Sequence, residues 1–364
     1  MKDSEVKKRL DEVIKSPMLQ INILAALTGA LAAFITWIFI NLTNIIKEFF
    51  YGDSFVNHSL RNTENEWLII FIPALGGLIA GLIIEYGSKD AKGAGVPIVM
   101  EAVAVKQARL SAKKAVAKFF ASAASIGSGM SLGRVGPMIV ISSTIGSEIG
   151  QRTGKTVEET RTIIGCGAAS AITAAFNAPL GGVLFAIELI LAELKTRSFI
   201  PIVVAAVIAT TVSRSLAGDV AAFDKIPHYS LGSPIEYPFY IILGLIVGLA
   251  ASIFIKLMNF VEDNIENIKG IPVPLRTCLG GLCVGLIALS FPHVLGNGFD
   301  VTSDLISLDS DNSDGLIIGE SFPVDTDINS GIASLLIFVL SIMALKIIAT
   351  SISTYCCACS MKLT

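Results

Sequence analysis

Long stretches without a single charged residue limit what this chain can fold into. A helix of about 20 apolar residues crosses a lipid bilayer. Charged residues make up 16% of the chain, against about 25% in a typical soluble domain, and the mean hydropathy is +0.71. We therefore expect an all-α integral membrane protein. Three full spans and a fourth are expected from the uncharged stretches, which are Ile21 to Ile46, Trp67 to Ile84, Ser198 to Val212 and Tyr237 to Ile255.

Shorter apolar segments interrupted by glycine or proline lie between these stretches. They are Val96 to Val105, Val135 to Ser147 and Pro179 to Ile187. Irregular backbone at membrane depth is tolerated only where protein or a water-filled cavity covers it. The sequence therefore predicts broken or re-entrant helices buried among the full spans.

Basic residues indicate the orientation. The charged stretch Met1 to Ser16 has no apolar core of its own, so it does not resemble a cleaved signal peptide. The next dense basic stretch, Lys89 to Lys118, follows two expected spans later, and the positive-inside rule places both on the cytoplasmic side. Tyr51 to Glu66 then faces outward. A net charge of −3 gives no support for nucleic-acid binding.

The chain carries a weak internal repeat, which is a mark of many transporters. Leu75-Gly76-Gly77-Leu78 and the later Gly93-Ala94-Gly95 correspond to Leu279-Gly280-Gly281-Leu282 and Gly296-Asn297-Gly298. Gly29 to Ala33 similarly matches Gly248 to Ala251, and Lys118 to Ser122 matches Lys346 to Thr350. The alternative is that small residues recur in any membrane helix because they allow close packing.

The repeat predicts the organisation of the chain. We expect a cytoplasmic segment over 1–19, a first membrane repeat over 20–217, a connecting loop over 218–237 and a partial second repeat over 238–364. After Ser125 the first half runs into a glycine-rich turn, whereas after Ser353 no such turn follows. The second repeat is therefore expected to be truncated.

Two polar features have competing interpretations. The loop at about 303–329 is acidic, and its run Asp309 to Asp314 resembles a calcium loop, although Asp314 replaces the required glycine; a solvated loop is favoured. Cys356, Cys357 and Cys359 lack a nearby histidine or second Cys-x-x-Cys pair, so we expect no metal site. The other cysteines, Cys166, Cys278 and Cys283, are expected to pack in helices. We expect no cofactor.

Three glycine- and proline-rich segments carry the candidate chemistry. They are Gly93-Ala94-Gly95-Val96-Pro97, then Gly127 to Pro137, and then Phe176-Asn177-Ala178-Pro179-Leu180. In the first two, glycines lead to a proline that opens an apolar run, and proline is favoured in the first turn of a helix. The free amides and the dipole of such a helix end attract an anion. Singly, each segment can also be a simple kink.

Together, the three segments resemble the CLC family of chloride channels and proton-coupled chloride transporters. The family's motifs G-S-G-I-P, G-(R/K)-E-G-P and F-N-A-P-L appear in the same order. The resemblance implies a CLC-like bundle of full-length and re-entrant helices built from two inverted repeats, and a homodimer in which each subunit has its own anion pathway. It assigns to that pathway Gly93, Ala94, Gly95, Val96, Pro97, Gly133, Arg134, Val135, Gly136 and Pro137.

Three departures from the family pattern matter. Ala94 replaces the motif serine, so one hydroxyl donor for the anion is missing. Val135 occupies the gate position, where the transporters have a glutamate that blocks the pathway and carries protons. Leu189 occupies the position of their inner proton-transfer glutamate. Passive chloride conduction therefore fits better than proton-coupled antiport, because coupling needs titratable groups along the path.

Two other classes of function compete with conduction. A membrane enzyme finds no H-E-x-x-H motif, no P-loop and no fitting G-x-G-x-x-G segment, so we expect no enzymatic activity. A non-conducting, truncated remnant is the second alternative, because the family's later pathway motif is missing. The expected partners are chloride or a similar small anion, the lipid bilayer of the cell membrane, and a second copy of the chain.

Overall fold

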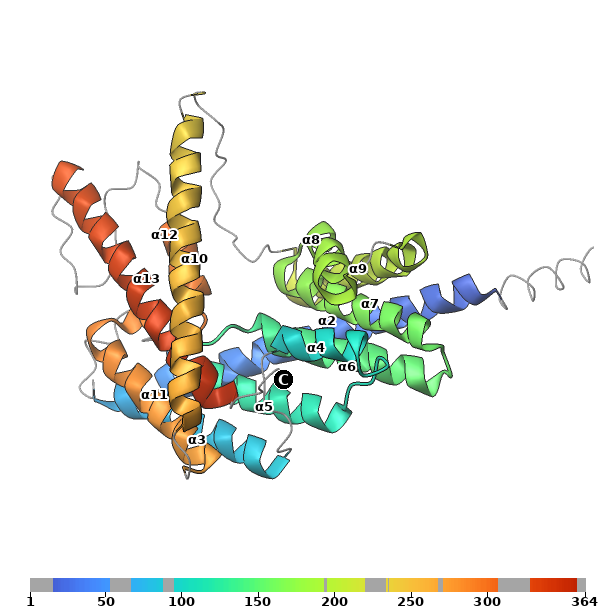
Figure 1. The fold of residues 1–364 in the computed structure, drawn as a ribbon, viewed down its shortest axis with the longest axis horizontal. Coiled ribbons are helices and arrows are strands. Elements are labelled where there is room, and N and C mark those ends of the chain that lie inside the picture. Colours follow the sequence, from blue (N-terminus) through green and yellow to red (C-terminus); the bar gives the residue numbers. More distant parts are fainter. Residues whose placement is uncertain are drawn as a thin grey trace, which may run out of the picture. The chain divides into compact units, whose positions relative to one another are not determined.

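The computed structural model describes residues 16–52, 67–87, 95–192, 195–219, 234, 236–267, 271–306 and 328–358, and the regular structure in these ranges is helical (Figure 1). The helices, in chain order, are α2 (Pro17–Tyr51), α3 (Leu68–Leu82), η3 (Ile83–Gly87), α4 (Gly95–Ala104), α5 (Ala112–Gly127), α6 (Val135–Arg152), α7 (Val157–Phe176), α8 (Pro179–Phe185), η4 (Ala186–Leu191), α9 (Thr196–Ala217), α10 (Glu236–Asn267), α11 (Val273–Ser290), η5 (Pro292–Val294), α12 (Phe299–Ile306) and α13 (Ile328–Ala358). The predicted all-α class is confirmed.

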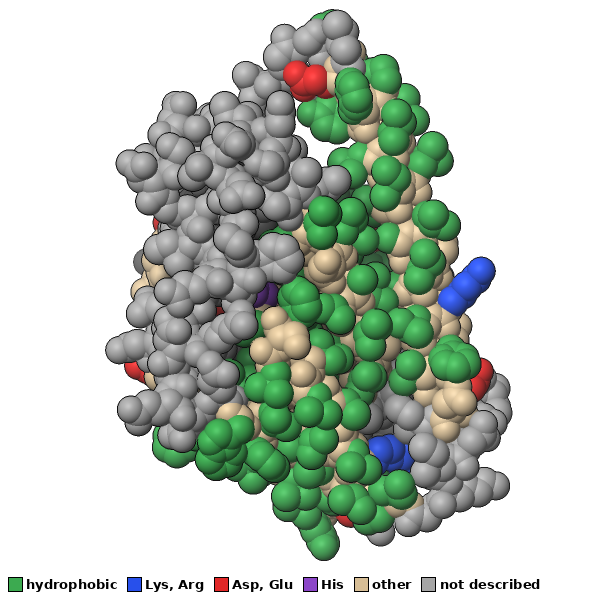
Figure 2. Space-filling view, turned by 90° about the vertical axis from the view of Figure 1, so that its left-hand side faces the viewer, with side chains coloured by type: hydrophobic (Ala, Val, Ile, Leu, Met, Phe, Trp, Pro, Cys, Tyr) green, Lys and Arg blue, Asp and Glu red, His purple; other side chains and the backbone are tan. Residues whose placement is uncertain are grey.

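Six helical segments within the described residues are long and apolar enough to cross a membrane. They are Pro17–Tyr51, Leu68–Gly87, Arg197–Ala217, Glu236–Val261, Val273–Ser290 and Ile337–Thr354. The four expected spans are among them, and the segments in α11 and α13 are two more. The exposed surface agrees with a lipid environment, because hydrophobic side chains dominate the described part of the face shown in Figure 2, where few charged side chains appear.

The short interrupted segments also form helices. Gly95–Ala104 and Pro179–Leu191 are apolar helices too short to span a bilayer unaided. The third segment differs from the expectation, because α6 continues to Arg152 as one uninterrupted helix of 18 residues. Besides Gly136 in its first turn, α6 contains Gly146 and Gly150, and both of these glycines lie where α7 packs closely.

The chain divides into two compact units. The first comprises Met1–Leu42, Gly93–Phe120 and Arg134–Ala222, and the second comprises Thr43–Lys92, Ala121–Gly133 and Phe223–Thr364. The second unit thus contains segments from both predicted repeats. The repeat boundaries themselves remain a prediction; the proposed connecting loop at 218–237 begins directly after α9, and its last two residues are the first two of α10.

Glycines bring the helices of the first unit together. A Cβ atom added to Gly146 would lie 2.4 Å from the carbonyl oxygen of Ile163, and one added to Gly167 would lie 2.3 Å from that of Ser142. The α6 and α7 backbones are therefore nearly in contact. Gly29 on α2 meets the carbonyl oxygen of Ala205 on α9 in the same way, at 2.4 Å. Such close backbone approach is typical of membrane helices, where packing stabilises association.

The second unit is built around α3 and α11, which pack along each other and carry the two matched Leu-Gly-Gly-Leu segments. Helix α13 packs against α11 and α10. A buried apolar cluster joins the end of α2 to these helices; it contains Tyr51, Ile69, Val284, Ala288, Val294, Leu295 and Ala349. The Tyr51 hydroxyl donates a hydrogen bond of 2.8 Å to the carbonyl oxygen of Ser128, which satisfies the one polar atom of this side chain.

Most of α10 lies outside this packing. None of the residues in its most apolar window is buried, and Cβ atoms added to Gly244 or Gly248 would meet nothing within 4 Å. The predicted repeat matches Gly248 with Gly29, whose Cβ position on α2 is covered by Ala205. The two matched segments therefore have different surroundings in the described residues.

Candidate functional site

The first turns of α4 and α6 share a sequence pattern. Helix α4 begins Gly95-Val96-Pro97 and α6 begins Val135-Gly136-Pro137, so proline is the third helical residue in both. Proline is tolerated there because the first amides of a helix have no partner within it. Both helices therefore present unpaired backbone amides and a partially positive dipole end.

The structure brings these two first turns into contact. A Cβ atom added to Gly95 would lie 2.6 Å from the Cα atom of Gly136 and 2.7 Å from its carbonyl carbon and oxygen. Helices α4 and α6 also pack against each other beyond this point. Gly95, Val96 and Pro97 are thus gathered with the predicted pathway residues at the start of α6.

Arg134 and Val135 lie at the N-terminus of α6. Arg134 is the N-cap residue, with helical backbone angles (φ −78°, ψ −20°), and its side chain makes no capping hydrogen bond. The carbonyl oxygen of Arg134 accepts a hydrogen bond from the Met138 amide at 3.5 Å. Val135, at the predicted gate position, is the first residue of the helix and is half-buried.

Leu189 lies in η4, the π-helical continuation of α8. This helix packs against α4 and α7, and Leu189 is 42% exposed. Its neighbour Glu188 is also exposed. The predicted inner proton position, Leu189, is thus carried by η4, which packs against α4, the helix that continues from the first anion motif.

The remaining predicted pathway residues are placed only in part. Gly93 and Ala94 lie outside the described residues, so the missing serine hydroxyl has no structural description. Gly133 belongs to the second compact unit, and a Cβ atom added there would meet nothing within 4 Å. Gly133 therefore faces open space and does not share the close contact that joins Gly95 to Gly136.

The third motif has a structural role that the sequence did not reveal. Asn177 ends α7 in the left-handed conformation (φ 53°, ψ 35°). Its side-chain amide donates to Asp219 at 2.9 Å, and its amide oxygen accepts from Arg214 at 3.0 Å. Arg214 also pairs with Asp219 at 3.0 Å. Asn177 therefore links the C-terminus of α7 to the C-terminus of α9, and α8 begins two residues after it.

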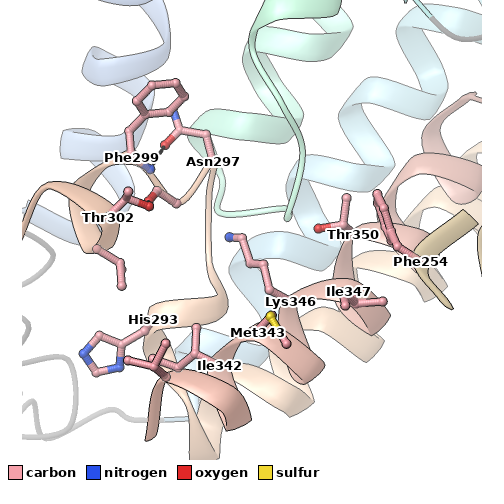
Figure 3. Close-up of a pocket in the computed structure, with 13 residues that line it drawn as sticks. Phe254, His293, Asn297, Phe299, Thr302, Ile342, Met343, Lys346, Ile347 and Thr350 are labelled. Carbon is pink, nitrogen blue, oxygen red and sulfur yellow. Dashed lines mark hydrogen bonds between the residues drawn. The ribbon is translucent and has the colours of Figure 1, made fainter. Parts of the chain in front are cut away.

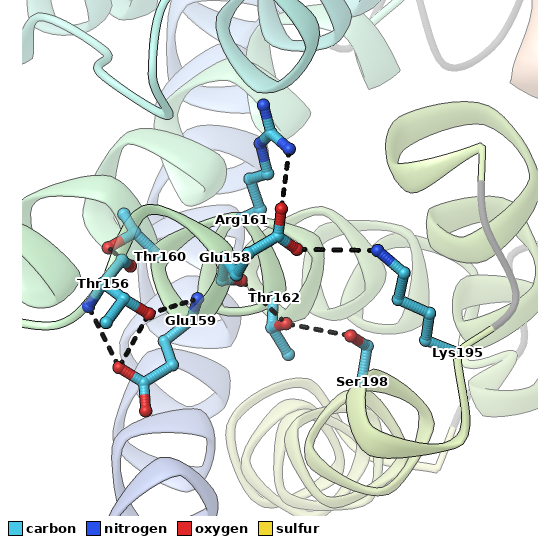
Figure 4. A network of polar contacts seen from close by, with 8 residues as sticks. All are labelled: Thr156, Glu158, Glu159, Thr160, Arg161, Thr162, Lys195 and Ser198. Carbon is cyan, nitrogen blue, oxygen red and sulfur yellow. Dashed lines mark hydrogen bonds and ion pairs between the residues drawn. The ribbon is translucent and has the colours of Figure 1, made fainter.

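A polar network fixes the start of α7 (Figure 4). The Thr156 hydroxyl accepts from the Glu159 amide at 3.3 Å, and a Glu159 carboxylate oxygen accepts from the Thr156 amide at 2.9 Å. These hydrogen bonds hold the pKa of Glu159 below its usual value, the Thr156 backbone amide being the largest cause. Glu158 pairs with Arg161 at 3.0 Å and with Lys195 at 3.6 Å, which links α7 to the segment before α9.

A half-buried lysine, Lys346, borders a cavity of about 540 Å³ in the second unit (Figure 3). The Lys346 ammonium donates to the carbonyl oxygens of Val294 and Gly296 at 2.7 and 2.8 Å, and lies 3.4 Å from that of Leu295. The other walls come mainly from apolar residues of α10, α12 and α13, including Phe254, Ile342 and Met343. Lys346 thus holds the loop that leads into α12.

The cysteines follow the sequence-based expectation only in part. Cys166 is buried in α7, but Cys278 is half-buried and Cys283 is exposed on α11, so packing in a helical interior describes only the first. The Cys356 and Cys357 side chains, Cys359 and the acidic run Asp309 to Asp314 lie outside the described residues. In the described ranges, no group of three or more His, Cys, Asp or Glu side chains comes together.

A comparison with protein families identifies the family to which this chain belongs. Residues 76–360 match the family model described as voltage gated chloride channel. This range includes both contacting first turns and all three motifs. The chain belongs to the CLC family.

Curated relatives agree with this CLC assignment. The chain is 34% identical over 244 residues to a ClcB-like chloride channel protein of Ralstonia nicotianae, covering 66% of this chain and 56% of the relative. It is 31% identical over 265 residues to chloride channel protein CLC-f of Arabidopsis thaliana, covering 68% of this chain and 32% of the relative. The chain therefore spans about half or less of the length of these relatives.

Solved structures share the CLC fold. A slow cyanobacterial Cl⁻/H⁺ antiporter superimposes with a TM-score of 0.74 at 20% identity, covering 94% of this chain and 75% of the antiporter. A CLC-type fluoride/proton antiporter gives a TM-score of 0.68 at 17% identity, covering 92% of this chain and 76% of the other. The likeness confirms the CLC-like bundle of two inverted repeats in a multi-pass integral membrane protein.

Proposed function

We propose that this CLC protein conducts chloride or a similar small anion passively across the membrane. The observation that carries the proposal is the contact between Gly95 and Gly136, which brings two helix N-termini together. Each end is equivalent to roughly half a positive charge. Two such charges about 4 Å apart repel by about 1 kcal/mol at an effective dielectric constant of about 20. An anion bound beside both helix ends relieves this repulsion.

Passive conduction is favoured over proton coupling by the side chains at two positions. Val135 begins α6, and Leu189 lies on η4, which packs against α4. Neither side chain can bind or release a proton, so the two positions that the family resemblance assigns to proton transfer carry no titratable group. The two superimposed antiporters are only 20% and 17% identical to this chain, so their coupling to protons describes those proteins alone.

Other aspects of the proposal rest on the sequence. We place the protein in the cell membrane, and the basic residues near the N-terminus favour a cytoplasmic N-terminus. The family resemblance favours a homodimer in which each subunit carries its own pathway. The contacting helix ends need only backbone amides, so the proposed site requires neither a metal nor a cofactor.

The test is anion flux from liposomes that contain the purified protein, with chloride efflux and internal pH recorded together. Empty liposomes are the control. Chloride efflux without proton movement supports passive conduction, and stoichiometric proton movement overturns it in favour of antiport. Absence of flux, with protein correctly inserted, favours a non-conducting protein. Cross-linking of the inserted protein tests the dimer separately.

A further inference from the structure

The contact between α4 and α6 is unequal. A Cβ atom on Gly95 would lie 2.6 to 2.7 Å from three backbone atoms of Gly136, which is shorter than side chains tolerate. A Cβ atom on Gly136 would lie 3.5 Å from the Cα atom of Gly95 and 3.8 Å from its amide nitrogen, which is ordinary van der Waals contact. The spacing of the two helices therefore requires a glycine at position 95 but leaves room for a Cβ atom at position 136.

The atoms that Gly95 approaches are backbone atoms. A flexible side chain can rotate away from a new methyl group, but the Cα, carbonyl carbon and carbonyl oxygen of Gly136 move only with the first turn of α6. Pro137 follows directly and fixes its own φ angle, which limits local adjustment there. An added methyl group at position 95 is therefore relieved mainly by separating the two first turns.

We propose that Gly95 is a positioning residue that determines anion specificity: its missing side chain sets the spacing between the first turns of α4 and α6. The inference rests on the proposed function, because it assumes that an anion lies near these turns. A wider spacing weakens the interaction with chloride more than that with larger anions. In preorganised sites, a displacement of about 1 Å can change a rate by about 100-fold.

The contact supplies its own matched control. Gly95→Ala and Gly136→Ala each add one methyl group at the same helix crossing, yet only the first crowds the backbone. Gly248→Ala on α10 is a second control, because nothing lies within 4 Å of its Cβ position and it is not a predicted pathway residue. All three variants exchange a helical glycine for alanine, so general effects of removing a glycine appear in each.

The experiment measures chloride, bromide and nitrate flux in liposomes for the wild type and these variants. We expect Gly95→Ala to lower chloride flux about tenfold and to raise the nitrate-to-chloride flux ratio at least threefold, in line with the displacement argument. Gly248→Ala should keep the wild-type flux and ratio, and Gly136→Ala should shift the ratio much less than Gly95→Ala does. A ratio that is unchanged in Gly95→Ala, or shifted equally in Gly136→Ala, overturns the inference.

Two further measurements separate the possible failures. Chloride-dependent stabilisation against thermal unfolding in detergent reports binding without transport. A wild type with neither flux nor chloride stabilisation removes the proposed function, whereas an active wild type with an unchanged Gly95→Ala variant removes only this inference. If Gly95→Ala fails to fold, Gly136→Val replaces it in the experiment. A Cβ atom fits at position 136, but the two additional methyl groups of valine should push the first turns of α4 and α6 apart. Gly136→Val should raise the same flux ratio, and an unchanged ratio overturns the inference.

Discussion

Gly77 on α3 and Gly281 on α11 make reciprocal contacts with each other's helix. A Cβ atom on Gly77 would lie 2.3 Å from the carbonyl oxygen of Thr277, and one on Gly281 would lie 2.2 Å from that of Pro73. Thr277 and Pro73 are separated by as many residues as Gly281 and Gly77. Gly81 and Gly285 extend the pattern along the two antiparallel helices, meeting Pro274 and Ile70. The repeated segments therefore pack as two-fold counterparts.

This symmetry predicts equal effects of equivalent substitutions. Gly77→Ala and Gly281→Ala should each lower the free energy of unfolding by about 1–3 kcal/mol, because each places a methyl group against a backbone carbonyl. Thermal unfolding in detergent measures the effect. Gly248→Ala on α10 is the control, since nothing lies within 4 Å of its Cβ position; it should leave stability unchanged or raise it by up to about 1 kcal/mol. A large effect at only one of the paired glycines contradicts the symmetric contact.

A carboxylate at the gate position should make conduction depend on pH. Val135→Glu places a titratable group at the N-terminus of α6, where a negative charge is stabilised. Above its pKa, the carboxylate competes with chloride, so flux should fall about tenfold as pH rises, equivalent to about 1.4 kcal/mol. Liposome flux between pH 3 and pH 8 measures this, because the helix end lowers the carboxyl pKa from its usual value of about 4.3. Val135→Gln should show no such pH dependence, and a pH-independent Val135→Glu would contradict the proposed pathway.

The capping box of α7 should stabilise the protein in a pH-dependent way. The pKa of Glu159 is lower in the folded protein than in the unfolded chain, so the stabilisation is present above the unfolded-state pKa and is lost as pH falls through the lower, folded-state value. Thermal unfolding of the wild type and Glu159→Gln should therefore converge in acid. Thr156→Ala should cost about 1 kcal/mol at neutral pH. A constant difference between wild type and Glu159→Gln across the pH range would argue against the ionised cap.

Lys346 should be essential to the loop before α12. Lys346→Met removes a charged donor from the carbonyl oxygens of Val294 and Gly296, and each hydrogen bond to a charged group contributes about 1.5–3 kcal/mol. We expect a marked loss of thermal stability and faster protease cleavage in this loop. Lys256→Met, which removes an exposed lysine of α10, is the control and should behave as the wild type. Equal effects of both substitutions would show that the carbonyl contacts are unimportant.

Apolar length is a local property, so the sequence predicts four of the six segments in the described residues that are long enough to cross a membrane; it does not predict those in α11 and α13. It predicts α4 to within one residue at each end, and it predicts the start of α8 but ends the α8–η4 segment four residues early. Helix α7 is different: its small residues, such as Gly165, Ala168 and Ala169, give a weak hydropathy signal, and it received no prediction. The signal that was available is the spacing of Thr156 and Glu159, which is that of a capping box before an apolar run.

The candidate site was predictable as a set of residues and not as a geometry. The motifs identify Gly95 and Gly136 as pathway residues, but they treat the two glycines alike. Only the packing of α4 on α6 shows that one position has room for a methyl group and the other has none. Likewise, nothing in the spacing of Asn177, Arg214 and Asp219 indicates that they meet, because the contact depends on how α7 and α9 end together.

Lys346 lies at the middle of the apolar span Ile337–Thr354. A lysine at that depth costs an isolated helix about 2.5–3.5 kcal/mol during insertion from the translocon. The carbonyl groups that compensate for this cost belong to residues 294–296, which leave the ribosome earlier. Helix α13 thus gains its full affinity for the bilayer only after the loop between α11 and α12 has folded. During biosynthesis, this loop therefore has to fold before α13 inserts stably.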